Sequence, residues 1–93
     1  MTTDDRPQFA GAMTRLFAIY GDELTDSLLD AWWGVLAGYD LREVRLAMNC
    51  HATDQQWGHR RPAPSDIIRH LTETLPARRR EAHVAKVRAL RVA

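Results

Sequence analysis

The stretch from Leu28 to Tyr39 constrains the fold more than any other part of this chain. Its apolar residues recur at the three-and-four spacing of an α-helix, so they would form one continuous stripe. Trp32 lies within that stripe, whereas Trp33 lies about 100° away around the helix axis. Trp33 must therefore face a second layer of side chains or lie at the surface. The pattern predicts the central helix of a helical bundle.

Short sequence signals mark the ends of the first two helices. Proline is tolerated in the first turn of a helix, so Pro7 predicts a helix that begins close to it. Glycine adopts the left-handed cap conformation at low cost, so this helix should end near Tyr20, before Gly21. Thr25 is predicted to cap the N-terminus of the central helix, because its hydroxyl can accept a bond from a free backbone N–H.

The remaining helices are predicted from signals of the same kind. Asp40 and Glu43 have the spacing of a capping box, which predicts a third helix that ends near Thr53. Ser65 is predicted to cap a fourth helix, which Pro76 should end. Residues 54–64 have no helical periodicity and are predicted to form a loop.

The fold class expected from these elements is an all-α, compact bundle of four to five short helices. Gly34 and Gly38 each weaken the central helix by about 1 kcal/mol relative to alanine. We expect another helix to pack closely there, unless Gly38 simply begins the turn. The predicted core consists of Phe9, Met13, Leu16, Phe17, Leu28, Leu29, Trp32, Leu36, Tyr39, Val44, Met48, Ile67 and Leu71.

The net charge of +1 conceals an asymmetry along the chain. Residues 1–50 carry eight acidic and four basic side chains, residues 51–76 carry three of each, and residues 77–93 carry six basic side chains against one glutamate. We predict a helical domain over residues 1–76 and a basic C-terminal helix or flexible tail over residues 77–93. Such an asymmetry indicates a charged partner or a contact between the two ends.

The basic side chains of the tail are the first candidate binding site. They could neutralise nucleic-acid phosphates, contact an acidic protein, or simply face solvent on a helix. The loop is the second candidate site, where Trp57 either anchors a partner or folds back over the bundle. The candidate partner-binding residues are Trp57, Arg60, Arg61, Arg78, Arg79, Arg80, Lys86, Arg88 and Arg91.

The sequence contains no recognisable catalytic or cofactor-binding motif. Cys50, His51, His59 and His70 lack the spacing of zinc ligands. Consecutive helical side chains such as Cys50 and His51 diverge by about 100°, so they cannot form a local nucleophile–base pair. No glycine-rich phosphate-binding motif occurs. We predict no metal, no cofactor and no enzymatic activity.

Length and composition bound the remaining possibilities. A chain of 93 residues is one domain by length and can bury about 60–65% of its unfolded surface. No apolar run approaches the roughly 18–20 residues of a membrane span, the N-terminus is acidic and polar, and the single cysteine excludes an internal disulfide. We expect a cytoplasmic protein, monomeric or weakly homodimeric, with no membrane contact and no small-molecule substrate.

A series of short features follows a fixed order over about two thirds of the chain. The series consists of Tyr20-Gly21, Trp32, Tyr39-Asp40, Val44, Ala47 and Pro62-Ala63-Pro64-Ser65-Asp66-Ile67. In this order and spacing, residues 9–71 resemble the small helical domain of the phage replicative helicase loader/inhibitor proteins, which are found in phages and prophages.

The resemblance implies a compact helical domain with a flexible C-terminal part that engages a ring-shaped, DnaB-type replicative helicase. Such a protein restrains the helicase and delivers it to DNA. In this chain the resemblance assigns the helicase contact to the basic tail. We therefore expect a phage or prophage DNA replication accessory protein that loads or inhibits a helicase. The alternatives are a small nucleic-acid-binding or transcription-regulating phage protein, and a homodimeric structural module joined through Trp33 and the glycines.

Overall fold

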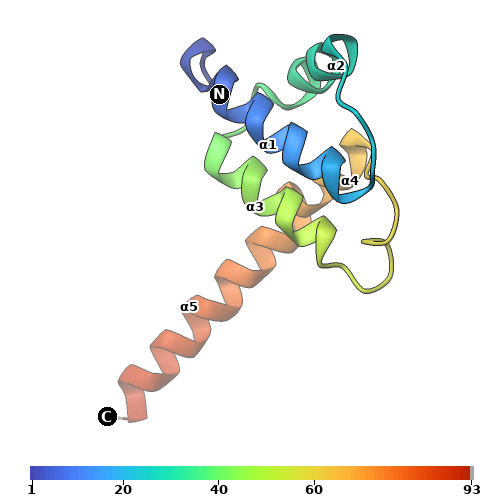
Figure 1. The fold of residues 1–93 in the computed structure, drawn as a ribbon. Helices are drawn as coiled ribbons and strands as arrows, with labels where there is room; N and C mark the ends of the chain where they lie inside the picture. Colours follow the sequence, from blue (N-terminus) through green and yellow to red (C-terminus); the bar gives the residue numbers. More distant parts are fainter. Residues whose placement is uncertain (93) are drawn as a thin grey trace.

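Helices form all the regular structure that is described for this protein (Figure 1). The computed structural model describes residues 1–92 and has no strand within them. The elements are the 3₁₀ helix η1 (Thr3–Asp5), α1 (Arg6–Ile19), α2 (Asp26–Leu36), α3 (Leu41–Ala52), α4 (Pro64–Arg69), the π-helical turn η2 (His70–Thr74) and α5 (Leu75–Val92). The predicted all-α fold class is confirmed.

The ends of α1 and the start of α2 lie where the sequence signals place them. Pro7 occupies the first turn of α1. Gly21 follows α1 with a φ of 71°, in the left-handed region that favours glycine. The Thr25 hydroxyl accepts a hydrogen bond from the backbone N–H of Leu28 at 3.2 Å, which caps α2. These three predictions are confirmed.

The capping box predicted at the start of α3 does not form. Asp40 occupies the N-cap position, but its side chain makes no capping hydrogen bond. Glu43 does not reach back to Asp40, because its carboxylate forms an ion pair with Arg79 of α5. A tertiary contact has therefore replaced the local one.

The prediction that Ser65 caps the fourth helix is wrong by two residues. Ala63 occupies the N-cap position of α4, and Pro64 is the first helical residue. The carboxylate of Asp66 accepts a hydrogen bond from the backbone N–H of Ala63 at 2.8 Å. A carboxylate in the first turn thus satisfies the free N–H group that the serine was expected to satisfy.

The prediction that Pro76 ends the helical path is also wrong. In a regular α-helix the ring of Pro76 would clash with the carbonyl of Thr72, four residues earlier. Here the chain forms the π-helical turn η2, in which the N–H of Leu75 donates to the carbonyl of His70. Pro76 then lies in the first turn of α5, where a missing N–H costs little. The helical path therefore continues from α4 into α5.

Aromatic side chains of α1 and α2 pack against one another in the core. Trp32 is 4% exposed and meets Phe17 edge-on, with ring centroids 5.9 Å apart. Trp33 is half-buried and meets Phe9 edge-on at 5.4 Å, so it packs against α1, the same helix that Trp32 contacts. The predicted core residues are all buried, except for four that are half-buried and pack against the core. These are Leu28, Leu29, Tyr39 and Leu71.

The glycines of the central helix do not mark a close helix–helix contact. A Cβ added at Gly34 or Gly38 would meet no heavy atom within 4 Å. Gly38 lies in the turn between α2 and α3, as the second interpretation of that residue anticipated. The expectation that another helix packs closely at these positions is wrong.

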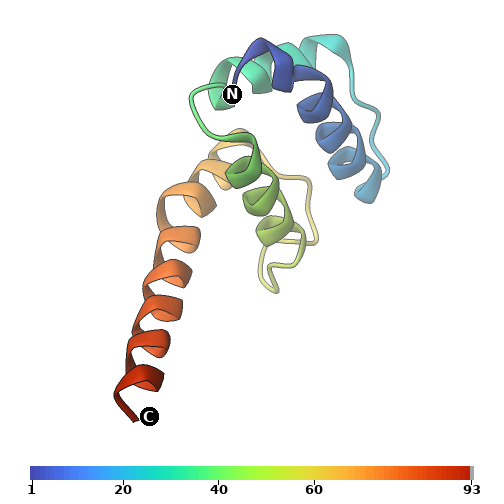
Figure 2. The ribbon, with the colours of Figure 1, turned by 90° about the vertical axis from the view of Figure 1, so that its left-hand side faces the viewer.

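The molecule is an α1–α4 body from which α5 projects (Figures 1 and 2). Its radius of gyration is 15.4 Å, whereas a compact domain of this length would have about 12 Å. The projection of α5 also accounts for the elongated shape, with principal extents of 53 × 31 × 18 Å. Within the described residues, no helix combines the length and apolar character needed to cross a bilayer.

Candidate binding surfaces

The predicted basic tail forms most of α5. All six of its basic side chains are exposed; they are Arg78, Arg79, Arg80, Lys86, Arg88 and Arg91. Arg79 pairs with Glu43, and the Arg78 guanidinium donates to the Cys50 sulfur at 3.4 Å, so these two residues fasten the first turns of α5 to α3. The other four have no acidic partner within residues 1–92.

The outer part of α5 also exposes aliphatic side chains among its charges. Val84 is 46% exposed and Leu90 is 71% exposed. Because the body does not cover this part of the helix, both its cations and these side chains face solvent. A partner could contact the helix from several directions.

The loop between α3 and α4 holds the second predicted site. The Arg60 guanidinium lies 4.5 Å from the centre of the Trp57 ring, and Trp57 is half-buried. Arg61 contacts Asp22 at 3.4 Å and lies over the Phe17 ring at 5.5 Å. The structure thus brings Trp57 and Arg60 together, whereas α5 projects away from this loop (Figures 1 and 2).

The conformation of this loop is fixed by hydrogen bonds to its own residues. The Asp54 carboxylate accepts the backbone N–H groups of Gln56 at 2.8 Å and Trp57 at 2.9 Å. These bonds, that of Trp57 first, lower the pKa of Asp54. The Tyr20 hydroxyl donates to the carbonyl of Gly58 at 2.9 Å, which ties the loop to the end of α1.

Two buried histidines join the loop, α3 and the π-helical turn. His51 Nε2 donates to the carbonyl of Arg60, and His70 Nδ1 lies 2.9 Å from the Thr74 hydroxyl. The two rings meet edge-on, with centroids 6.3 Å apart. Burial is the main cause that lowers the pKa of His70, and the nearby Arg69 lowers it further.

We expect the protein to become less stable as the pH falls from about 7 to about 5. The pKa of His70 is lower in the folded chain than its usual 6.5, so the unfolded chain binds the proton more readily. The stabilisation that the neutral His70 side chain contributes is therefore complete above pH 6.5 and is lost as the pH falls below it. Urea denaturation across this range measures the effect.

The matched variants for the pH experiment are His70→Gln and His59→Gln. His70→Gln should flatten the pH dependence, whereas His59→Gln, at an exposed loop position, should retain it. An unchanged slope in His70→Gln, or a wild-type protein that becomes more stable in acid, would contradict the assignment.

Metal binding and nucleophilic catalysis gain no support from the geometry. No group of three or more His, Cys, Asp or Glu side chains that could hold a metal occurs in the part of the chain that the structure describes. Cys50 is buried beside Arg78, and its neighbour His51 bonds to the Arg60 carbonyl.

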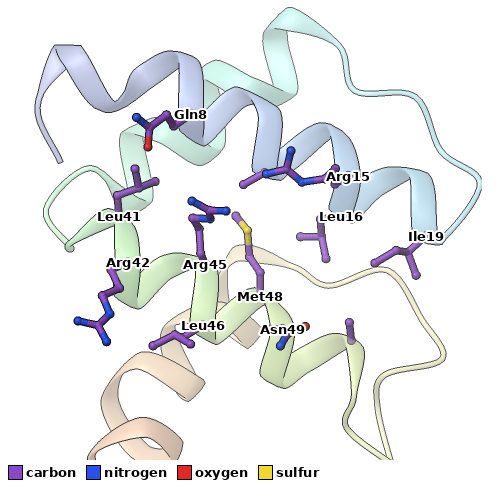
Figure 3. A pocket seen from close by; sticks show the side chains of 12 residues that line it. Gln8, Arg15, Leu16, Ile19, Leu41, Arg42, Arg45, Leu46, Met48 and Asn49 are labelled. Atoms are coloured by element: carbon purple, nitrogen blue, oxygen red, sulfur yellow. The ribbon is translucent and has the colours of Figure 1, made fainter.

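The residue pattern did not reveal a groove between the outer faces of α1 and α3 (Figure 3). It has a volume of about 610 Å³, and Arg15, Arg42 and Arg45 are among the residues that line it. No motif in the sequence includes these arginines. The spacing of Arg42 and Arg45 places both on one face of α3, but nothing local to either helix shows that Arg15 lies opposite.

No family model, curated protein or solved structure matches this chain. Three surfaces therefore carry the functional argument. They are the exposed part of α5, the Trp57–Arg60 loop, and the groove between α1 and α3. The first of these carries four basic side chains that have no acidic partner within residues 1–92.

Proposed function

We propose that this protein is a non-enzymatic DNA replication accessory protein of a phage or prophage. It binds a DnaB-type replicative helicase through α5, and so loads or inhibits it. The observation that carries the proposal is the projection of α5 beyond the body, with Arg80, Lys86, Arg88 and Arg91 free of intramolecular ion pairs within the described residues. The nature of the partner rests on the resemblance of residues 9–71 to helicase loader/inhibitor domains.

The geometry suggests how such a protein would act. The contacts of Arg78 and Arg79 hold the base of α5 against α3, so the helix presents its charges at a fixed angle to the body. Exposed positive charge steers an acidic partner surface into contact and makes the association sensitive to salt. The protein shifts a helicase ring between open and closed forms only if it binds one form better.

We expect the triple variant Arg80→Gln/Arg88→Gln/Arg91→Gln to bind the DnaB-type helicase of the same cell about 10- to 100-fold more weakly than the wild type. Three exposed ion pairs contribute roughly 0.5–1 kcal/mol each, which gives this range. Titration calorimetry with purified helicase measures the affinity, and size-exclusion chromatography shows whether a complex forms.

The matched control is Arg15→Gln/Arg42→Gln/Arg45→Gln, which removes the same charge from the body. This control should retain the wild-type affinity for the helicase. The proposal fails if wild-type protein and helicase do not comigrate at micromolar concentration. It also fails if the two triple variants bind equally well.

A second candidate function is nucleic-acid binding through α5. What favours it is the exposure of Arg80, Lys86, Arg88 and Arg91 on α5, without acidic partners in the described chain. Four phosphate contacts would give a slope of log affinity against log salt of roughly −3.6. Duplex DNA binding with such a slope would favour this function, and no binding at low salt would eliminate it.

A further inference from the structure

The groove between α1 and α3, here called the α1–α3 groove, has an apolar floor. Ala12 and Leu16 of α1 and Met48 of α3 line it, and all three are buried. Ile19 and Leu46 line it as well, yet they are 63% and 44% exposed. Large aliphatic side chains at the open side of an apolar groove are typical of an interaction site.

The arginines of the α1–α3 groove lack the acidic partners that three other arginines of the chain have. Arg6, Arg61 and Arg79 each pair with an aspartate or a glutamate. Arg15, Arg42 and Arg45 are exposed and form no ion pair within residues 1–92. No acidic residue is found among the groove residues that the structure describes. The groove is therefore an uncompensated positive site on a body whose first 50 residues are acidic overall.

Two of these arginines lie between the helices. Figure 3 shows the Arg45 side chain reaching from α3 toward α1, and the Arg15 side chain lying along α1 above it. A Cβ added at Gly11 would lie 3.8 Å from the Arg15 guanidinium, so this side chain follows the surface of α1. Both guanidinium groups thus border the apolar floor and can pair with carboxylates above it.

We propose that the α1–α3 groove binds an acidic amphipathic helix of a partner protein. The apolar floor suits leucine-type side chains spaced three and four residues apart, and the arginines suit glutamates or aspartates that flank them. Both walls are single helices, and the 12 residues of α3 extend about 18 Å. The bound segment therefore has about three helical turns.

A nucleic acid fits this groove less well than a helix does. No aromatic side chain on which a base could stack is among its described lining residues. A phosphate backbone would gain nothing by covering Ile19 and Leu46, whereas the apolar face of a helix would bury both. This site is separate from α5, and its occupant is a different partner from the one proposed to bind α5.

Two synthetic helical peptides of about 14 residues test the proposal. Both have leucines at three-and-four spacing; one carries glutamates on the flanks of that stripe, and the other carries lysines. We expect the glutamate peptide to bind the full chain in fluorescence anisotropy and to shift backbone amide resonances of α1 and α3. The lysine peptide should not bind.

Two charge-matched variants complete the test. Arg15→Gln/Arg45→Gln should weaken binding of the glutamate peptide about tenfold or more, whereas Arg88→Gln/Arg91→Gln should leave it within about twofold. All four side chains are exposed, so circular dichroism should show wild-type folding for both variants.

Several results would overturn the proposal. These are no binding of the glutamate peptide at millimolar concentration, equal binding of the lysine peptide, or resonance shifts confined to α5. Duplex DNA binding or self-association that Arg15→Gln/Arg45→Gln abolishes would assign the groove to a different occupant. Since the test uses no helicase, it can fail while the helicase proposal holds, and the converse is also true.

Discussion

Replacing Trp32 with alanine is expected to lower the free energy of unfolding by about 3–5 kcal/mol. Trp32 is 4% exposed, and its ring packs edge-on against Phe17, which is 1% exposed. The substitution leaves a cavity between α1 and α2 that the surrounding helices can fill only in part. The total stability of such a domain is about 5–15 kcal/mol, so the variant should lose a large part of its free energy of unfolding. A larger fraction of its molecules should therefore be unfolded at moderate temperature.

Urea denaturation followed by far-ultraviolet circular dichroism measures this loss without relying on tryptophan fluorescence. Val35→Ala is the matched control, since Val35 lies on the same helix and is 46% exposed. This control should change stability by no more than about 0.5 kcal/mol. A loss below about 1 kcal/mol in Trp32→Ala would show that the indole is not a central core residue.

Gly58→Ala is expected to destabilise the protein by roughly 1–3 kcal/mol, although it adds only one methyl group. A Cβ at this position would collide with the carbonyl oxygen of Asp54 and lie 2.7 Å from that of His51. Both are backbone atoms, one in the last turn of α3 and one just after that helix, so they cannot turn aside as a side chain would. The displaced loop should also weaken the bond from the Tyr20 hydroxyl to the Gly58 carbonyl.

Gly34→Ala is expected to have the opposite effect and to stabilise the protein. Its added Cβ meets nothing within 4 Å, and alanine is favoured over glycine in a helix by about 1 kcal/mol. This variant should therefore be more stable than the wild type in the same denaturation experiment. If Gly58→Ala were as stable as the wild type, or Gly34→Ala less stable, the described positions of the two glycines would be contradicted.

The parts of the fold that the sequence predicts correctly depend on chemistry within a few residues. Pro7, Gly21 and Thr25 act through their own backbone or through a neighbouring N–H, so their effects can be read without knowing the rest of the chain. The apolar periodicity around Trp32 works in the same way, because it fixes which face of α2 is buried.

The incorrect predictions concern residues whose effect depends on the tertiary structure. Glu43 was expected to cap α3, but an arginine of α5, 36 positions further along the chain, pairs with it. Gly34 was expected to lie under another helix, but it faces open space. Pro76 was expected to end the helix, but the widened turn before it removes the steric conflict.

The candidate sites also differ in whether the sequence alone reveals them. The charges of α5 are evident from the sequence, because they are concentrated in one stretch of the chain. The α1–α3 groove is not evident, because Arg15 and Arg45 belong to helices that are separated in sequence by all of α2. Which exposed faces lie next to one another depends on how the helices pack, and residue spacing within one helix does not contain that information.

The π-helical turn η2 determines the direction in which the basic helix α5 projects from the body. Successive residues of an α-helix are rotated by about 100°, so one residue more or less between His70 and Thr74 would turn every later side chain by that angle. Arg79 would then no longer face Glu43, although the composition of α5 would be unchanged. Homologous chains could thus share the same basic helix and still present it to different partners, through nothing more than the length of this five-residue segment.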